Sequence, residues 1–306
     1  MKKIITLSFV LGTVCIHQIK AQNFEWVKSM EGNDRVTSIT SDENENIFAT
    51  GYFSDTVDFD PGAGIWKLAP AGQSDMFISK MNGAGEFQWA RQIGGAEWEQ
   101  GSSITLDGEG NIYITGGFQG IVDFNPDTGI SDTLFLNATG TSFDIFVLKL
   151  NPDGTLIWAK QFGGNNTDFG HAIIADNESS VYVTGRFIDV ADFNPDIDDT
   201  YYLNSSGFED VFICKLDSTG SFNWAMKLGE GDYDSGESIK VDRDNNVYAA
   251  GGFSGTVDFD PGTGIFNLTS SSGSLDSYVL KLSKDGNFLW ARHFESPLWD
   301  YTPAIE

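Results

Sequence analysis

Carboxylate and amide oxygens recur in this chain with the alternate spacing that opens a calcium-binding loop. In one such loop, Asp123, Asn125 and Asp127 are followed by Gly129. An EF-hand is excluded, because Leu134 stands at the twelfth position, where a bidentate glutamate is required. Two interpretations stay open: a non-standard calcium loop, or an Asx-turn whose side chains accept bonds from nearby backbone amides. The candidate metal ligands are Asp58, Asp60, Asp123, Asn125, Asp127, Asp192, Asn194, Asp196, Asp198, Asp258 and Asp260.

A second set of acids lies five residues before regularly spaced isoleucines. An aromatic residue directly precedes three of them, Glu99, Asp234 and Asp300. An aromatic face beside a carboxylate can bind a sugar or a cationic group, through stacking or cation–π attraction and a charged hydrogen bond. The alternative is a loop acid that accepts backbone amide bonds. The candidate ligand-binding residues are Trp98, Glu99, Asp168, Tyr233, Asp234, Trp299 and Asp300.

Few other groups could support catalysis. His171 and His293 occupy positions where the equivalent residues differ in type, and the spacing assembles no nucleophile, base and orienting acid. We therefore assign no catalytic residue. Cys214 is equivalent to Ser79 and to two leucines, which predicts a buried strand thiol rather than a nucleophile. Paired carboxylates could still serve a glycosidase, so an enzyme acting on polysaccharide remains an alternative.

All these residues sit in a repeating pattern of short apolar segments. Between residues 99 and 162, alternation and turn residues predict strands over 102–106, 111–118, 144–150 and 156–162, with a long connector between the second and third. Asn151-Pro152-Asp153-Gly154 has the chemistry of a tight turn, and no segment has helical periodicity over three turns. A tryptophan marks each fourth strand, at spacings of 63, 69, 66 and 66 residues: Trp26, Trp89, Trp158, Trp224 and Trp290.

Tandem units of four antiparallel strands predict an all-β fold, a β-propeller of four-stranded blades. A two-sheet sandwich is the alternative, but it does not require near-identical copies of one meander. Four blades are complete, and a fourth strand around Trp26 and a first strand around Ile305 form a split, incomplete closing blade. We therefore expect the chain to be a fragment, truncated at its C-terminus. In such blades both sets of acids emerge on one face, which predicts a strongly negative rim.

The segments Asn-Ile-Tyr-Ile-Thr-Gly-Gly-Phe (111–118), Asp-Ile-Phe-Val-Leu-Lys-Leu (144–150) and Leu-Ile-Trp-Ala-Lys (156–160) resemble the SBBP-type β-propeller repeats of bacterial proteins. The resemblance covers essentially the whole chain after its leader. It implies an exported propeller, which in this family is often part of a longer multidomain protein. The resemblance transfers no catalytic motif to this chain.

The first 22 residues have the pattern of a secretory signal peptide, with two early lysines and an apolar run too short to span a bilayer. Residues 23–306 form the predicted propeller domain. The net charge is −26, and −29 without the three lysines of the leader, which argues against nucleic-acid and anionic-membrane partners. We expect a secreted or cell-surface binding module for an extracellular protein or glycan, with calcium as the one candidate cofactor. A structural spacer in a larger surface protein is a further alternative.

Overall fold

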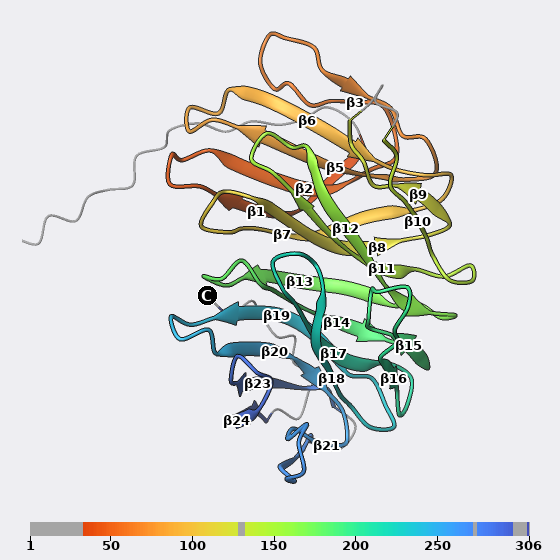
Figure 1. Cartoon of the computed structure of the whole chain (residues 1–306), viewed down its shortest axis with the longest axis vertical. Helices are drawn as coiled ribbons and strands as arrows, with labels where there is room; N and C mark the ends of the chain where they lie inside the picture. Colours follow the sequence, from red (N-terminus) through yellow and green to blue (C-terminus); the bar gives the residue numbers. More distant parts are fainter. Residues whose placement is uncertain (1–32, 128–131, 272–273, 296–304, 306) are drawn as a thin grey trace, which may run out of the picture.

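The computed structural model describes residues 33–127, 132–271, 274–295 and 305, and every regular element within them is a β-strand (Figure 1). Four units, each of four long antiparallel strands, follow one another along the chain. Their strands in chain order are β1 (Asp34–Ser41), β2 (Ile47–Phe53), β5 (Asp75–Met81) and β6 (Phe87–Ile93); β7 (Glu99–Leu106), β8 (Ile112–Phe118), β11 (Asp144–Leu150) and β12 (Leu156–Gly164); β13 (Phe169–Ala175), β14 (Val181–Phe187), β17 (Asp210–Leu216) and β18 (Phe222–Leu228); β19 (Ser235–Val241), β20 (Val247–Phe253), β23 (Asp276–Leu282) and β24 (Phe288–Phe294). The predicted all-β, antiparallel fold is confirmed.

The connector between the second and third strands of each unit contains a short hairpin that the sequence did not predict. These hairpins pair β3 (Val57–Asp58) with β4 (Lys67–Leu68), β9 (Ile121–Asp123) with β10 (Phe135–Asn137), β15 (Val190–Asp192) with β16 (Tyr202–Asn204), and β21 (Thr256–Asp258) with β22 (Asn267–Thr269). Each is too short to show alternation, which is why the pattern missed it. A phenylalanine after the hairpin's first strand folds back into the core, as Phe193 does against Phe187 at 5.3 Å between ring centroids.

The first strand of each unit is longer than its predicted core. The strand β7 begins at Glu99 rather than 102, and a β-bulge at Ser102 interrupts its register with β8. The bulge brings a backbone carbonyl close to the glycine of the second strand. A Cβ on Gly185 would lie 2.0 Å from the carbonyl oxygen of Phe169, so only glycine fits there. His171 is the residue at the bulge of β13.

The first strands β1, β7, β13 and β19 lie side by side, and the units join one another along them (Figure 1). On the side where strands one to two and three to four are joined by tight turns, the contacts between units repeat. Trp158 lies against Gly220 of the next unit, and its indole N–H donates to Ser218 O at 3.2 Å. Trp224 does the same with Gly286 and Lys284 O, also at 3.2 Å.

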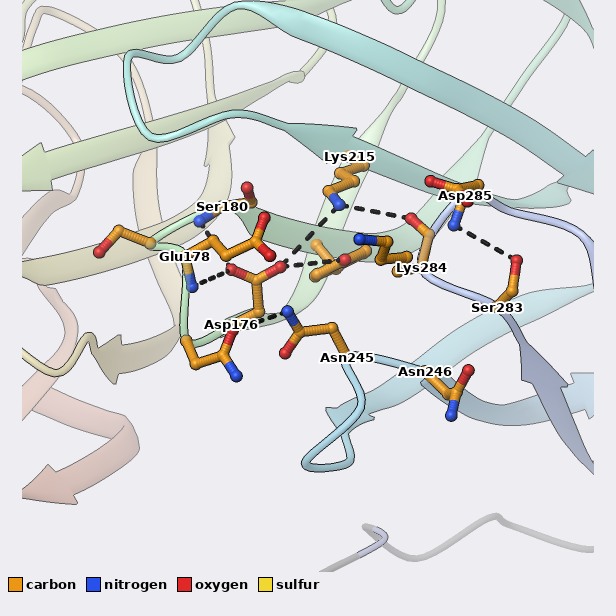
Figure 2. Close-up of polar contacts among 12 residues, drawn as sticks. Asp176, Glu178, Ser180, Lys215, Asn245, Asn246, Ser283, Lys284 and Asp285 are labelled. Carbon is orange, nitrogen blue, oxygen red and sulfur yellow. Dashed lines mark hydrogen bonds and ion pairs between the residues drawn. The ribbon is translucent and has the colours of Figure 1, made fainter.

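A buried ion pair accompanies this contact between the third and fourth units (Figure 2). Asp176, 4% exposed, accepts bonds from the amides of Glu178 and Ser180, each at 2.9 Å, and its other oxygen lies 3.9 Å from the Lys215 ammonium. Lys215 also donates to Lys284 O across the junction. We call the side that carries these contacts the turn side, and the opposite side, with the connectors, the connector side.

Neighbouring units bury each other's first strands. Ile104, Ile173 and Ile239 are 5%, 4% and 3% exposed, whereas the equivalent Ile39 of the first unit is 67% exposed. The amide of Ile305 donates to Ser238 Oγ at 3.2 Å, which repeats the bond from Ile173 to Ser103 at 3.3 Å. Ile305 therefore makes the same bond to the fourth unit that Ile173 makes to the second, at the position that its spacing predicted.

The predicted burial of Cys214 is confirmed, since its side chain is 0% exposed in β17. Burial raises the pKa of its thiol well above the usual range. The predicted leader, the strand around Trp26, and the candidate residues Trp299 and Asp300 lie outside the described residues.

Candidate functional site

The acids that precede the first strands are buried between units instead of forming an exposed rim. Glu99, Asp168 and Asp234 are at most 1% exposed, so the expectation of a negative rim is wrong for them. The two oxygens of Asp234 accept bonds from the amides of Ser254 at 2.9 Å and Glu230 at 3.1 Å. Burial raises the pKa of Asp168 and Asp234 to about 7 and that of Glu99 to about 8, although the amide bonds act in the opposite direction.

The candidate metal ligands in the connectors accept bonds from their own loops. Asp192 Oδ1 accepts from the amides of Asn194 at 3.0 Å and Tyr201 at 2.8 Å, and Asn194 accepts from Asp196 at 3.1 Å. Asp58, Asp123 and Asp258 bind the corresponding amides in their loops. The bonds to the amide two residues further on are Asx-turn bonds, and the bonds from Tyr201 and its equivalents close the loop. Across the part of the chain that the structure describes, no three His, Cys, Asp or Glu side chains are grouped to hold a metal ion. Calcium binding by these loops stays a prediction.

A cavity of about 990 Å³ opens on the connector side between the third and fourth units. Its walls come from β13, β14, the loop before β19 and the connector around β21 and β22, and Arg186, Tyr233 and Glu237 contribute to its lining. Serine and threonine hydroxyls line the fourth unit's wall: Ser254, Thr256, Thr269, Ser270, Ser271 and Ser274. The volume lies within the usual range for ligand pockets, roughly 300–1,000 Å³.

Two charged pairs form the polar part of this pocket. One guanidinium nitrogen of Arg186 donates to both oxygens of Glu209, at 2.7 and 2.8 Å. His171 Nδ1 lies 3.1 Å from Gly236 O and 3.5 Å from the Glu237 carboxylate. Burial acts to raise the pKa of Glu237, but hydrogen bonds and the charge of His171 outweigh it, and the pKa is lowered.

The His171 cluster does not have the geometry of a serine hydrolase. Ser235 Oγ lies 3.4 Å from His171 and donates to Glu237 at 2.6 Å, so serine, histidine and acid are all present. In a catalytic triad the serine and the acid bind opposite ring nitrogens of the histidine. Here both approach the same Nδ1 atom, which also faces the Gly236 carbonyl oxygen. The cluster can therefore bind and orient polar groups, but this arrangement provides no activated nucleophile.

Two aromatic rings stand beside the charged pairs. Phe208 and Tyr233 are stacked, with centroids 5.1 Å apart and planes 8° from parallel, and they are 60% and 52% exposed. The equivalent positions are Gln73 and Trp98 at the first junction, and Ser142 and Thr167 at the second. The stacked pair therefore belongs to the third junction alone among the three that join the described units.

Of the sequence-predicted ligand residues that the structure describes, only Tyr233 and Asp234 line this pocket, and Asp234 does so as a buried acceptor of backbone amide bonds. Trp98, 37% exposed, and Glu99 lie at the first junction. Asp168 lies at the second junction, where Thr167 rather than an aromatic residue precedes it. Sequence reasoning did not assign His171, Arg186, Phe208, Glu209 or Glu237 to a site. The signal in the sequence was that these residues differ from their equivalents in the other units. This difference was noted for His171, but no partner was assigned to it.

Comparison with known proteins confirms the family resemblance. The SBBP beta-propeller repeat matches two segments, residues 88–116 and 157–186. The chain is also similar to an uncharacterized WD repeat-containing protein of Acanthamoeba polyphaga mimivirus, with 27% identity over 84% of this chain. The match covers 22% of that protein's length. Two segments of this chain are therefore similar to a beta-propeller repeat.

A search of the described residues for a membrane-spanning helix found none of sufficient length and apolar character.

Proposed function

We propose that this chain is an exported β-propeller that acts as an interaction module, and that the pocket between the third and fourth units is its ligand site. The four described units would be blades, and the position of Ile305 supports a further blade after the fourth. The proposal of export, to the cell surface or beyond, rests on the leader-like pattern of residues 1–22. Similarity to a WD repeat-containing protein supports an interaction role.

The observation that carries this proposal is the exposed Phe208–Tyr233 pair, of which Tyr233 lines the pocket, at one of the three junctions between the described units. Exposed, preorganised aromatic rings are typical anchors of binding sites. The equivalent positions hold one aromatic residue at the first junction, Trp98, and none at the second, so the other junctions form without such a pair.

An array of defined extracellular peptides and glycans tests the proposal. We expect ligands that bind the native protein to be lost by Tyr233→Ala and retained by Trp98→Ala, which alters the equivalent position at the first junction. A native protein that binds nothing on the array, or ligands equally sensitive to both variants, would contradict a binding site here and favour a structural spacer.

A polysaccharide hydrolase or lyase is the second candidate, because the pocket is asymmetric and contains a carboxyl of raised pKa, that of Asp234. Two observations weigh against it. Both Asp234 oxygens are occupied by backbone amides, and the pKa of Asp168 is raised similarly outside the pocket. The raised pKa is therefore a property of this position in more than one unit, and it does not by itself mark a catalytic acid. Release of sugar reducing ends or unsaturated products by the native protein, lost on Glu237→Gln, would favour the enzyme.

A further inference from the structure

We infer that this pocket binds a basic side chain, a lysine ammonium or an arginine guanidinium, of a protein partner. The inference rests on the proposed binding function and names the class of ligand.

The charges that line the pocket leave an excess of carboxylate. The charge of Arg186 is matched by Glu209, which binds it through both oxygens. Glu237 faces His171, and its side chain is still 44% exposed. Asp232, on the pocket wall, is exposed as well. The pocket therefore has two accessible carboxylates, those of Glu237 and Asp232, for one imidazole, and an incoming cation can form charge-assisted hydrogen bonds with them.

The stacked rings provide the second element of a cation site. An ammonium or guanidinium group is attracted to the face of an aromatic ring, and an accessible face next to carboxylates strengthens the attraction. Tyr233 lines the pocket one residue from Asp234 and four from Glu237, so the ring and the carboxylates come from one segment of the fourth unit. The excess negative charge sets this site apart from a neutral aromatic platform.

The chain already uses the same combination within its units. Lys215 lies 4.8 Å from the centroid of the Tyr182 ring, near the Asp176 carboxylate, and Lys281 lies 4.6 Å from Tyr248 and 3.1 Å from Asp242. The Lys215 cluster is shown in Figure 2. In these internal sites the lysine comes from the same chain. In the pocket the ring and the carboxylates are present, and the described lining residues supply no lysine.

The size of the pocket and the charge of the protein fit a peptide partner. A volume of about 990 Å³ holds a long basic side chain with part of its backbone, and the hydroxyl-rich wall offers donors and acceptors to that backbone. The net charge of −26 steers a basic partner toward the protein and makes its association salt-dependent. A neutral glycan could stack on the rings, but it would gain nothing from the excess of carboxylate.

The test uses the full chain and three capped twelve-residue glycine–serine peptides whose central residue is lysine, arginine or glutamate. Their binding is followed by two-dimensional NMR at 50 and 300 mM NaCl, together with a neutral oligosaccharide, cellopentaose. We expect the lysine and arginine peptides to bind with shifts centred on residues 232–237, and the glutamate peptide not to bind. Tyr233→Ala should weaken binding by about threefold or more. Asp232→Asn, at an exposed position, should also weaken it.

Two control variants separate this site from general attraction. Glu43→Gln makes the same charge change at an exposed position of the first unit, and Trp98→Ala removes the equivalent aromatic ring; both should bind as the native protein does. Equal weakening by Glu43→Gln and Asp232→Asn would overturn the inference, because the attraction would then be unspecific. Cellopentaose binding that depends on Tyr233, without peptide binding, would overturn the cationic ligand and leave the proposed binding function intact. If nothing binds at residues 232–237, the inference is overturned, while the array above decides the broader function.

Discussion

The two sides of the molecule differ in how faithfully they repeat. On the turn side, Lys80, Lys149 and Lys215 each donate to a carbonyl oxygen of the next unit, and a tryptophan lies against the next unit's turn glycine. On the connector side, the junction positions vary from Gln73 and Trp98, to Ser142 and Thr167, to Phe208 and Tyr233. A contact that holds neighbouring units together is needed at every junction, whereas a binding site is needed only once. The comparison assigns assembly to the turn side and supports the proposal of a recognition site on the connector side.

A large effect is expected from breaking the buried ion pair of the turn side. Asp176→Ala leaves the ammonium of Lys215, 6% exposed, without its carboxylate and removes the acceptor of two amides and of the Tyr182 hydroxyl. We expect it to lower the free energy of unfolding by about 3 kcal/mol, measured by urea denaturation. The control is Asp217→Ala, which removes similar turn bonds from a half-buried position whose carboxylate forms no ion pair within 4.0 Å among the described residues, and should cost about 1 kcal/mol. Equal losses would show that the ion pair contributes nothing.

The next largest effect is a dependence of stability on pH. The folded-state pKa values of Asp168 and Asp234 are raised to about 7, above the unfolded values near 4, so folding favours the protonated form. Their contribution is fully present below pH 4 and is lost as pH rises through 7. Stability should therefore increase by roughly 2.5 kcal/mol for each of the two groups between pH 8 and pH 5. Denaturation in 0.5 M NaCl, which screens surface repulsion, measures this. The double variant Asp168→Asn with Asp234→Asn should have a flatter profile, and an unchanged profile would assign the effect to other groups.

The strand architecture was predictable because hydrophobic alternation and turn residues are local signals. The third strand, 144–150, was predicted with its observed ends, and the turn at 151–154 lies where proline and glycine indicated. The site was not predictable in the same way. Arg186 and Glu209 are 23 residues apart and pair across two strands of one unit that a long connector separates. His171 and Glu237 are 66 residues apart, and their pairing depends on how two units pack. The burial of Asp234 was missed for a similar reason: its amide partners belong to separate loops.

A third effect concerns the exposed first strand. Ile39 presents the surface that Ile104, Ile173 and Ile239 bury against a preceding unit, and β1 has a free edge among the described strands. We expect the protein to self-associate, and Ile39→Lys to weaken that association by about 1.5 kcal/mol, the value for one apolar side chain. Light scattering after size-exclusion chromatography gives the measurement. Ile65→Lys, at a 76% exposed isoleucine in a connector, is the control. A stable native monomer would contradict the prediction.

Calcium should have a smaller effect, and it separates the two interpretations of the connector loops. A site with a dissociation constant near 10⁻³ M would stabilise the protein by roughly 0.6 kcal/mol at 2 mM calcium. The loops with Asp123 and Asp192 carry the most oxygen ligands and should bind best. Thermal melts compare calcium with sodium at equal ionic strength, for the native protein and for Asp123→Asn with Asp192→Asn. If the double variant keeps the calcium-specific shift, or if no such shift occurs, the loops are Asx-turns only.

The smallest effect on stability is expected at the pocket. It tests most directly whether assembly contacts lie on the turn side and the binding site lies on the connector side. Tyr233→Ala removes a ring that is 52% exposed, so it should lower the free energy of unfolding by only about 0.5 kcal/mol. Trp158→Ala removes a ring that packs on Gly220 and donates to Ser218 O, and should cost about 3 kcal/mol or more. Urea denaturation of both variants provides the comparison. If Tyr233→Ala costs as much as Trp158→Ala, the stacked pair holds the third and fourth units together, and its exposure would no longer distinguish a binding surface from an assembly contact.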